Sequence, residues 1–219
     1  MPFSINTIAL GRPGLLPSCS IITKTISLHI TIILIITHFL HLHYRYDKIT
    51  CLEMAEHVGI KYFQTFLLQV KDMLKDDGVF YLQIAGLRTS WQFEDLIWGI
   101  FMNKFVFPGA DASMPLAWVI GQCESAGFEV RMSETIGVHY SATIKRWYDN
   151  WVANKEYVIK EYGENYYRRW EWFLAWSTII PENGSATCYQ IVLTKNTNAF
   201  NRKDFYIRNN FRGKHGDEQ

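Results

Sequence analysis

The order of strand-like and helix-like segments between residues 46 and 195 constrains the fold of this chain more than any other feature. Short runs rich in β-branched and apolar residues alternate with stretches whose apolar residues recur every three or four positions. Residues 47–54 (DKITCLEM) predict a buried strand, and residues 62–74 predict a helix with one buried face. The following KDDG is expected to stop that helix, with Gly78 as its C-terminal cap.

The rest of this region continues the alternation. The expected elements are a strand at 79–85 ended by a turn at Gly86, helices from Trp91 and from Pro115 with Gly127 past the end of the second, a strand and then a loop within 128–140, aromatic helices at 141–176, and a last strand at 186–195. This order predicts an α/β fold, namely the back half of a doubly wound sheet with an antiparallel final pair of strands and a helical insertion before the last one.

The chain divides into three parts by its composition. Residues 1–45 are rich in Ile, Thr and Ser, residues 46–197 carry the α/β pattern, and residues 198–219 are polar and are expected to form a solvated tail. Within the first part, the apolar stretch at 21–42 is a candidate for a membrane-spanning or interfacial anchor. Its β-branched residues also fit a buried strand at 28–37, so both interpretations stay open.

Charge and cysteine spacing exclude several classes of function. The formal net charge is +1, which gives no electrostatic footprint for nucleic acid. The four cysteines include no C-x-x-C pair, so neither a zinc ribbon nor a disulfide scaffold is expected, and no metal site is predicted. Aromatic residues make up 16% of the chain and crowd between 147 and 176, which fits a thick core, a membrane contact or a lipid-binding wall.

Three ordered blocks carry a resemblance to known enzymes. They are EMAEHVGIKYFQTFLLQVKDMLKDDGVFYLQIAG at 53–86, NKFVFPGADAS at 103–113 and GVHYSATIKRWYDNW at 137–151. They resemble the cyclopropane-fatty-acid synthase group, and LQIAG, FPGADAS and WYDNW within them resemble the fungal sphingolipid C9-methyltransferases. The resemblance covers about residues 46–202 and implies the C-terminal half of a class I (Rossmann-like) S-adenosylmethionine-dependent methyltransferase sheet.

The resemblance implies a reaction and a set of site residues. The reaction is methyl transfer from S-adenosylmethionine to C9 of the sphingoid base of a ceramide, with the double bond retained and a bound bicarbonate ion as the base. Glu56 would accept a hydrogen bond from that ion and Tyr140 would donate one, while Gln83 occupies a position held by histidine in bacterial members. Glu53 is assigned to the cofactor. The residues assigned to the lipid tunnel are Trp91, Phe105, Phe107, Trp147 and Trp151.

Each polar assignment also has a structural explanation. Glu56 next to a helix start is favoured by the helix dipole, and Tyr140 could be a core ring whose hydroxyl meets a carbonyl. The glycine-rich loop expected for the cofactor is not found, because GRPG at 11–14 reads as a turn. We therefore expect a truncated product whose own activity is questionable.

Two other functions remain open from the sequence. One is a cyclopropane-fatty-acyl-phospholipid synthase, and the other is a non-catalytic, membrane-associated lipid-binding fragment. The expected location is the surface of the endoplasmic reticulum or another endomembrane, with the domain facing the cytosol.

Overall fold

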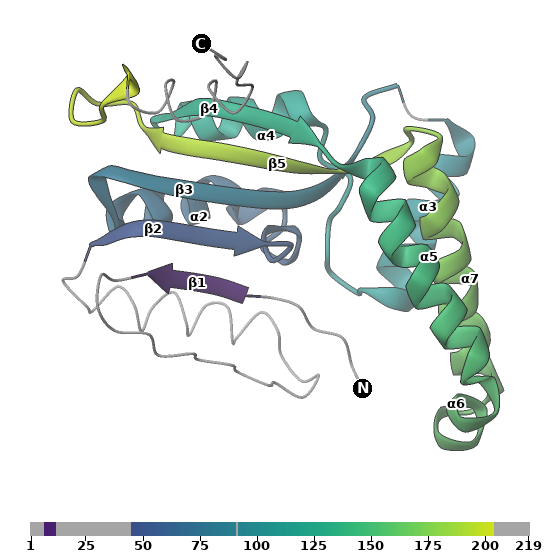
Figure 1. Ribbon diagram of the computed structural model, residues 1–219. Coiled ribbons are helices and arrows are strands. Elements are labelled where there is room, and N and C mark those ends of the chain that lie inside the picture. The colour runs from purple at the N-terminus through teal and green to yellow at the C-terminus, as the bar shows by residue number, and fades with distance from the viewer. Residues whose placement is uncertain (1–6, 12–44, 91, 204–219) are drawn as a thin grey trace, which may run out of the picture.

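The computed structural model describes residues 7–11, 45–90 and 92–203, which are built around one five-stranded sheet (Figure 1). The strand order is β1-β2-β3-β5-β4, with bounds Thr7–Gly11 for β1, Tyr46–Leu52 for β2, Leu74–Leu87 for β3, Phe128–Thr135 for β4 and Ala186–Lys195 for β5. β2 and β3 are parallel, whereas β5 is antiparallel to both β3 and β4. The expected half-sheet with its antiparallel final pair is confirmed.

The edge of the sheet beside β2 is occupied by β1, which was not expected as a strand. β1 pairs antiparallel with β2, with Ala9 opposite Thr50, and so provides partners for the backbone groups on that edge. Gly11, assigned to a turn from the sequence, is the last residue of this strand. The strand expected at 28–37 and the membrane segment expected at 21–42 lie outside the described residues.

The start of β3 corrects the expected end of the preceding helix. Helix α2 (Ile60–Met73) passes directly into β3 at Leu74, so Gly78 lies inside a strand and is not a helix cap. Two charged residues of KDDG, Lys75 and Asp76, are compatible with a strand because they form ion pairs at the end of the sheet. Lys75 Nζ lies 2.7 Å from Asp47 Oδ1 on β2.

Gly86 also lies within β3 instead of ending it at a turn. It pairs with Thr187 on β5, and β3 continues to Leu87. A Cβ atom at Gly86 would lie 2.1 Å from the carbonyl oxygen of Met114 and 2.6 Å from the ring of Tyr189. Glycine is therefore required here by the close approach of another backbone segment.

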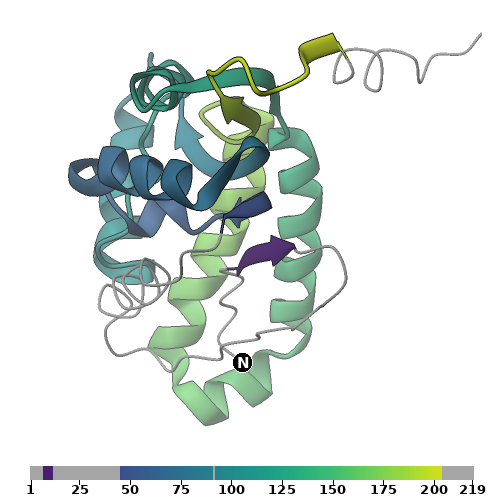
Figure 2. The same cartoon turned by 90° about the vertical axis from the view of Figure 1, so that its left-hand side faces the viewer.

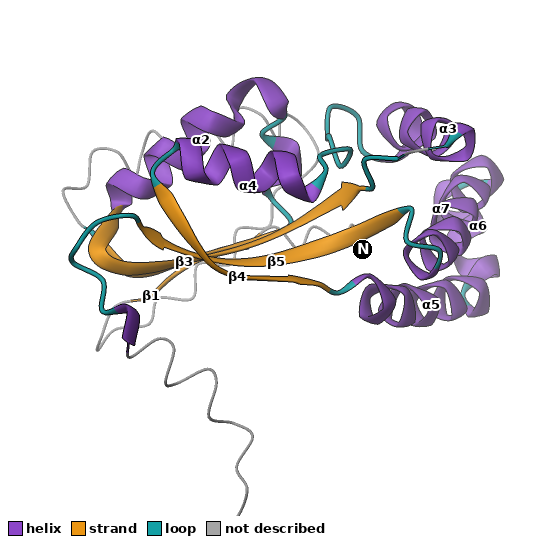
Figure 3. Cartoon of the chain, turned by 90° about the horizontal axis from the view of Figure 1, so that it is seen from above, coloured by secondary structure: helices purple, strands orange, loops and turns teal. Residues whose placement is uncertain are grey.

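One face of the sheet is covered by α2 and by α4 (Leu116–Ser125), which lie on the same side of the strands (Figure 3). The face of α2 predicted from the sequence is the buried one, including Phe63, Phe66 and Val70. These residues pack with apolar side chains of β2, β3 and β5 into the main core. Gly127 ends α4 with a φ of 85°, as its position in the sequence predicted.

The expected helical insertion lies beyond one end of the sheet (Figure 1). It contains α5 (Gly137–Ala153), α6 (Lys155–Tyr162) and α7 (Glu164–Glu182), and α5 and α7 run side by side (Figures 1 and 2). Helix α3 (Phe93–Phe101) continues as a π-helical turn, η2 (Met102–Val106), and packs against them. The segment GVHY was expected as a loop, but it is the first turn of α5, so Tyr140 is held on a helix.

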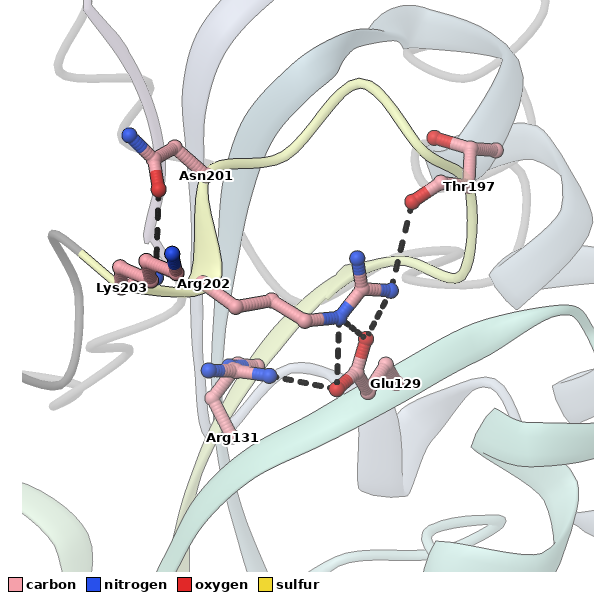
Figure 4. Close-up of polar contacts among 6 residues, drawn as sticks. All are labelled: Glu129, Arg131, Thr197, Asn201, Arg202 and Lys203. Atoms are coloured by element: carbon pink, nitrogen blue, oxygen red, sulfur yellow. Dashed lines mark hydrogen bonds and ion pairs between the residues drawn. The ribbon is translucent and has the colours of Figure 1, made fainter.

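The chain after β5 folds back onto β4 instead of leaving the domain at once. The Arg202 guanidinium hydrogen-bonds the Glu129 carboxylate on β4, with Nε 2.9 Å from Oε2, and donates to the Thr197 carbonyl (Figure 4). Arg131 contacts the same carboxylate from β4. The first residues of the expected polar tail, up to 203, therefore remain beside the sheet.

Candidate active site

A cavity of about 930 Å³ lies between the carboxyl ends of β2 and β3 and the helical insertion. Ligands of doubly wound sheets bind at this edge, where the strands end. Glu53 and Glu56 lie at the sheet side, and aromatic side chains from α3, α5 and α7 form much of the opposite wall. The cavity is therefore apolar over most of its length and polar at one end.

The polar end is organised around Glu53, directly after β2. The Tyr140 hydroxyl donates to Glu53 Oε2 at 2.6 Å, and Gln83 Nε2 donates to Glu53 Oε1 at 2.6 Å. The Gln83 amide is held in this orientation because its oxygen accepts a hydrogen bond from Gln190 Nε2 at 3.1 Å. Residues 53, 83 and 140 were given separate roles from the sequence. The structure brings them together, because the other two both donate to Glu53.

Glu56 lies beside this group in a short 3-10 helix, η1 (Ala55–His57). The backbone N–H of Ala85, at the end of β3, donates to Glu56 Oε1 at 2.5 Å, whereas Oε2 is buried without a hydrogen-bond partner among the described residues. Burial, and secondarily the charge of Glu53, raises the pKa of Glu56 to about 7. One end of the cavity therefore holds two acidic side chains with different surroundings. Glu53 accepts hydrogen bonds on both carboxylate oxygens, whereas the buried Glu56 accepts one on Oε1 only.

The groups around these carboxylates stay protonated near neutral pH. Burial raises the pKa of the Tyr140 hydroxyl far above its ordinary value, and the neighbouring Glu53 charge raises it further. The Cys188 thiol, 3.9 Å from Glu53 Oε1, has its pKa raised by the same two causes. Tyr140 is therefore a hydrogen-bond donor here, and Cys188 is not a thiolate nucleophile.

The apolar wall is a cluster of stacked rings. Trp98 of α3 stacks on Phe173 of α7 with ring centroids 5.9 Å apart and planes at 5°. Phe107 meets the same Phe173 ring edge-on at 5.6 Å. Such contacts fix the rings beyond what burial alone achieves, which gives the cavity a defined shape.

The residues assigned to a lipid tunnel are distributed unevenly. Phe107 and Trp147 line the cavity. Phe105 is 44% exposed on η2 and is not part of the lining, and Trp151 stacks on Tyr167 at 5.8 Å instead. Trp91 lies outside the described residues.

Two further features of the wall were missed from the sequence. Trp98 is almost fully buried at the centre of the ring cluster, and its i, i+3 spacing from Phe101 was the available signal. Asp95, buried in the first turn of α3, caps that helix by accepting from the Gln92 backbone N–H, and it also accepts two hydrogen bonds from Arg88. Gln92 and Asp95 have the N-cap to N3 spacing of a capping box, whose usual residues are Ser or Thr followed by Glu or Gln.

Two kinds of feature are missing from the described ranges. No helix there is long and apolar enough to cross a bilayer. No group of three or more His, Cys, Asp or Glu side chains in those ranges is placed to hold a metal ion.

The half-sheet and the helical insertion define the class of the fold, which is that of S-adenosylmethionine-dependent methyltransferases of the cyclopropane synthase type. A cyclopropane synthase from Mycobacterium tuberculosis superposes with a TM-score of 0.67 at 20% identity, covering 72% of this chain and 58% of that one. A mycolic acid cyclopropane synthase solved with SAH and CTAB gives the same score and coverage at 21% identity. At these identities the similarity establishes the fold alone.

Sequence comparison identifies the family. The family model described as mycolic acid cyclopropane synthetase matches residues 22–191, and this chain belongs to that family. The sphingolipid C9-methyltransferase of Komagataella phaffii is 62% identical over 161 residues, covering 74% of this chain and 33% of the relative. Sphingolipid C9-methyltransferase A of Emericella nidulans is 64% identical over 157 residues, covering 72% and 30%. The chain thus spans about a third of the length of these curated relatives.

More distant relatives include the cyclopropane-fatty-acyl-phospholipid synthase of Escherichia coli. It is 28% identical over 130 residues, covering 59% of this chain and 32% of that enzyme. The sequence identities to the two fungal methyltransferases described above, 62% and 64%, are more than twice this value. This agrees with the subfamily expected from LQIAG, FPGADAS and WYDNW.

Proposed function

We propose that this chain forms the lipid-binding and proton-transfer part of a sphingolipid C9-methyltransferase, which methylates C9 of the sphingoid base of a ceramide. The observation that carries the proposal is the cavity, in which an aromatic, apolar wall leads to a group of hydrogen-bonded acidic, amide and hydroxyl side chains. An apolar wall suits an alkyl chain and keeps water from a cation formed on it. The acidic side chains at its polar end suit removal of a proton.

The proposed methyl donor is S-adenosylmethionine, in agreement with the class of the fold. When bound, it supplies an electrophilic methyl group on a positively charged sulfur. The Glu53 carboxylate at the polar end of the cavity is complementary to this charge. A glycine-rich cofactor loop is not among residues 7–11, 45–90 and 92–203, so the described residues account for only one side of a cofactor site.

The bicarbonate ion implied by the family resemblance does not fit the described arrangement of donors. Tyr140 and Gln83, which would donate to the ion, already donate to Glu53, and the Ala85 N–H donates to Glu56. An added anion would also meet the Glu53 carboxylate that these donors already hold. We therefore assign no step to bicarbonate.

Product analysis tests the proposed function. The 219-residue chain and a longer form of the protein would each be incubated with S-adenosylmethionine and a ceramide with a sphingadienine base, and the lipid examined by mass spectrometry and NMR. We expect addition of one methyl group with both double bonds retained. A cyclopropane ring on a phospholipid acyl chain would favour the alternative synthase. Lipid binding without methyl transfer in either form would favour a non-catalytic fragment.

We further propose that α3 contacts a membrane surface, from which the lipid enters the cavity. Phe93, Leu96, Ile97 and Ile100 of this helix are all exposed, and Leu96 and Ile100 also line the cavity, together with the buried Trp98. This surface continues to the half-exposed Trp172 of α7, whose ring lies 4.1 Å from that of Phe101. Tryptophan and lysine at the edge of an apolar patch are typical of interfacial contacts, and Lys104 lies at this edge, over the Phe105 ring. Attachment to the endoplasmic reticulum or another endomembrane, facing the cytosol, stays a prediction.

Replacing Ile97 by aspartate is expected to weaken vesicle binding about tenfold, because one isoleucine leaves the bilayer and a charge replaces it. The measurement is co-sedimentation of the chain with phosphatidylcholine vesicles containing ceramide. Leu68→Asp on α2 is the matched control, since Leu68 and Ile97 are both 45% exposed. An equal loss in both variants, or none in Ile97→Asp, would contradict an interface at α3.

A further inference from the structure

Glu53 has an unusual backbone conformation. Its φ is 52°, and it is the only residue other than glycine with a positive φ in the described ranges. A glutamate rarely adopts this left-handed region, and such outliers concentrate at functional sites. The conformation is held by the backbone, because the Glu53 N–H donates to the Gln83 carbonyl at 2.9 Å. The turn after β2 thus directs a carboxylate to the polar end of the cavity.

The Glu53 side chain is held on both of its oxygens by groups from three different elements. Tyr140 of α5 donates to Oε2, while Gln83 of β3 donates to Oε1 and the Cys188 thiol of β5 lies near the same oxygen. The Gln190 side chain fixes the Gln83 amide from its other side. This is the surrounding that a bound anion would need, and here a carboxylate of the chain itself occupies it.

Gln83 has a clear role in this arrangement. A histidine was implied at this position by the bacterial relatives, and imidazole changes its charge near neutral pH whereas an amide does not. The Gln83 amide uses its N–H to hold Glu53 and its oxygen to accept from Gln190, without any change of charge. Gln83 and Glu53 therefore function as a pair.

We propose that Glu53 is the proton acceptor of the methylation reaction, in the place that the resemblance gives to bicarbonate; this rests on the proposed function. Tyr140 and Gln83 are then positioning residues that aim its carboxylate into the cavity. Glu53 lines the cavity together with Glu56 and Tyr140, as this role requires. The neighbouring Glu56 is more deeply buried than Glu53, and this burial raises the pKa of Glu56 to about 7, so Glu56 holds its proton below that pH.

The chemistry balances with no further reactant. The alkene of the lipid uses its π pair to form the new bond to the methyl carbon, while the pair of the broken carbon–sulfur bond stays on sulfur. The neighbouring alkene carbon becomes a cation. A Glu53 oxygen takes the proton from the methylated carbon, and the electrons of that C–H bond restore the double bond. The positive sulfur and the negative carboxylate both end neutral, and the new carboxylic acid later releases its proton to water.

The first test concerns the anion site alone and needs no cofactor. We expect the 219-residue chain to show no binding of ¹³C-bicarbonate by NMR at millimolar concentration, because Glu53 occupies the donors. In the variant Glu53→Gly, glycine can adopt the positive φ of this position without strain. The Tyr140 hydroxyl and the Gln83 amide then lose the carboxylate to which they donate, and we expect them to bind bicarbonate instead. Adding Tyr140→Phe to Glu53→Gly is expected to weaken that site. Equal binding of bicarbonate by the unchanged chain and by Glu53→Gly would overturn the proposal.

The second test measures catalysis in whichever form of the protein, short or long, methylates ceramide. In bicarbonate-free buffer, Glu53→Gln is expected to lower the rate at least about 100-fold, as removal of a positioned base does. Glu53→Gly is expected to be equally slow and to recover in part with added bicarbonate or formate. A Glu53→Gln rate within about threefold of the unchanged protein, or an unchanged protein that itself requires bicarbonate, would overturn the proposal. If neither form methylates ceramide, the proposed function fails, and the binding test still decides whether Glu53 fills the anion site.

Discussion

Replacing Gly86 by alanine is expected to destabilise the chain by about 3 kcal/mol, at the upper end of what overpacking costs. The added Cβ would lie 2.1 Å from the Met114 carbonyl oxygen and 2.6 Å from the Tyr189 ring. Neither neighbour can yield easily, since Met114 is buried and Tyr189 donates its hydroxyl to the Leu87 carbonyl at 3.3 Å. β3 or the segment before α4 must therefore shift.

Urea denaturation followed by tryptophan fluorescence measures this effect through the unfolding midpoint. Gly121→Ala is the control, because a Cβ at Gly121 in α4 would meet nothing within 4 Å. That substitution is expected to stabilise the chain by about 0.5–1 kcal/mol, since alanine is the better helix former. If Gly86→Ala unfolds at the same urea concentration as the unchanged chain, the close approach over β3 does not exist in solution.

Gly86 also shows which parts of the fold could be predicted from the sequence and which could not. The last strand was predicted with its observed bounds, because ATCYQIVLTK is β-branched and apolar between clear polar ends. Gly86 and KDDG were both interpreted as turns, since glycine and charged residues interrupt strands when only local preference is considered. Their place inside β3 depends on partners distant in sequence, namely Met114 over Gly86 and Asp47 beside Lys75.

The residues of the candidate site could be predicted from the sequence, but the hydrogen bonds between them could not. Glu56, Gln83 and Tyr140 were assigned through the family resemblance, as ligands of a separate anion. The first turn of α5 was taken for a loop, so the direction of Tyr140 toward the end of β2 could not be derived. Glu53 was assigned to the cofactor, and only its positive φ and the two hydrogen bonds to its carboxylate bring it to the centre of the group.

The distinction between the two glutamates leads to a prediction about pH. Burial raises the pKa of Glu56 from 4.5 to about 7, so the folded chain keeps a proton there that the unfolded chain releases. Between these two pH values the unfolded state binds fewer protons, and the free energy of unfolding therefore falls as the pH rises. The shift corresponds to a loss of about 3 kcal/mol, complete once the pH exceeds 7.

Glu56→Gln removes this titration and keeps an oxygen that can accept from the Ala85 N–H. We expect the free energy of unfolding of the unchanged chain to fall relative to the variant by about 3 kcal/mol between pH 4.5 and 8. Urea denaturation of both proteins across this range measures it, and the difference between them cancels the contributions of all other groups. A difference that stays constant would show that folding leaves the pKa of Glu56 at its ordinary value, so that Glu56 is ionised near neutral pH. Two charges would then face the cavity, and the assignment of the proton to Glu56, which leaves Glu53 as the acceptor, would be wrong.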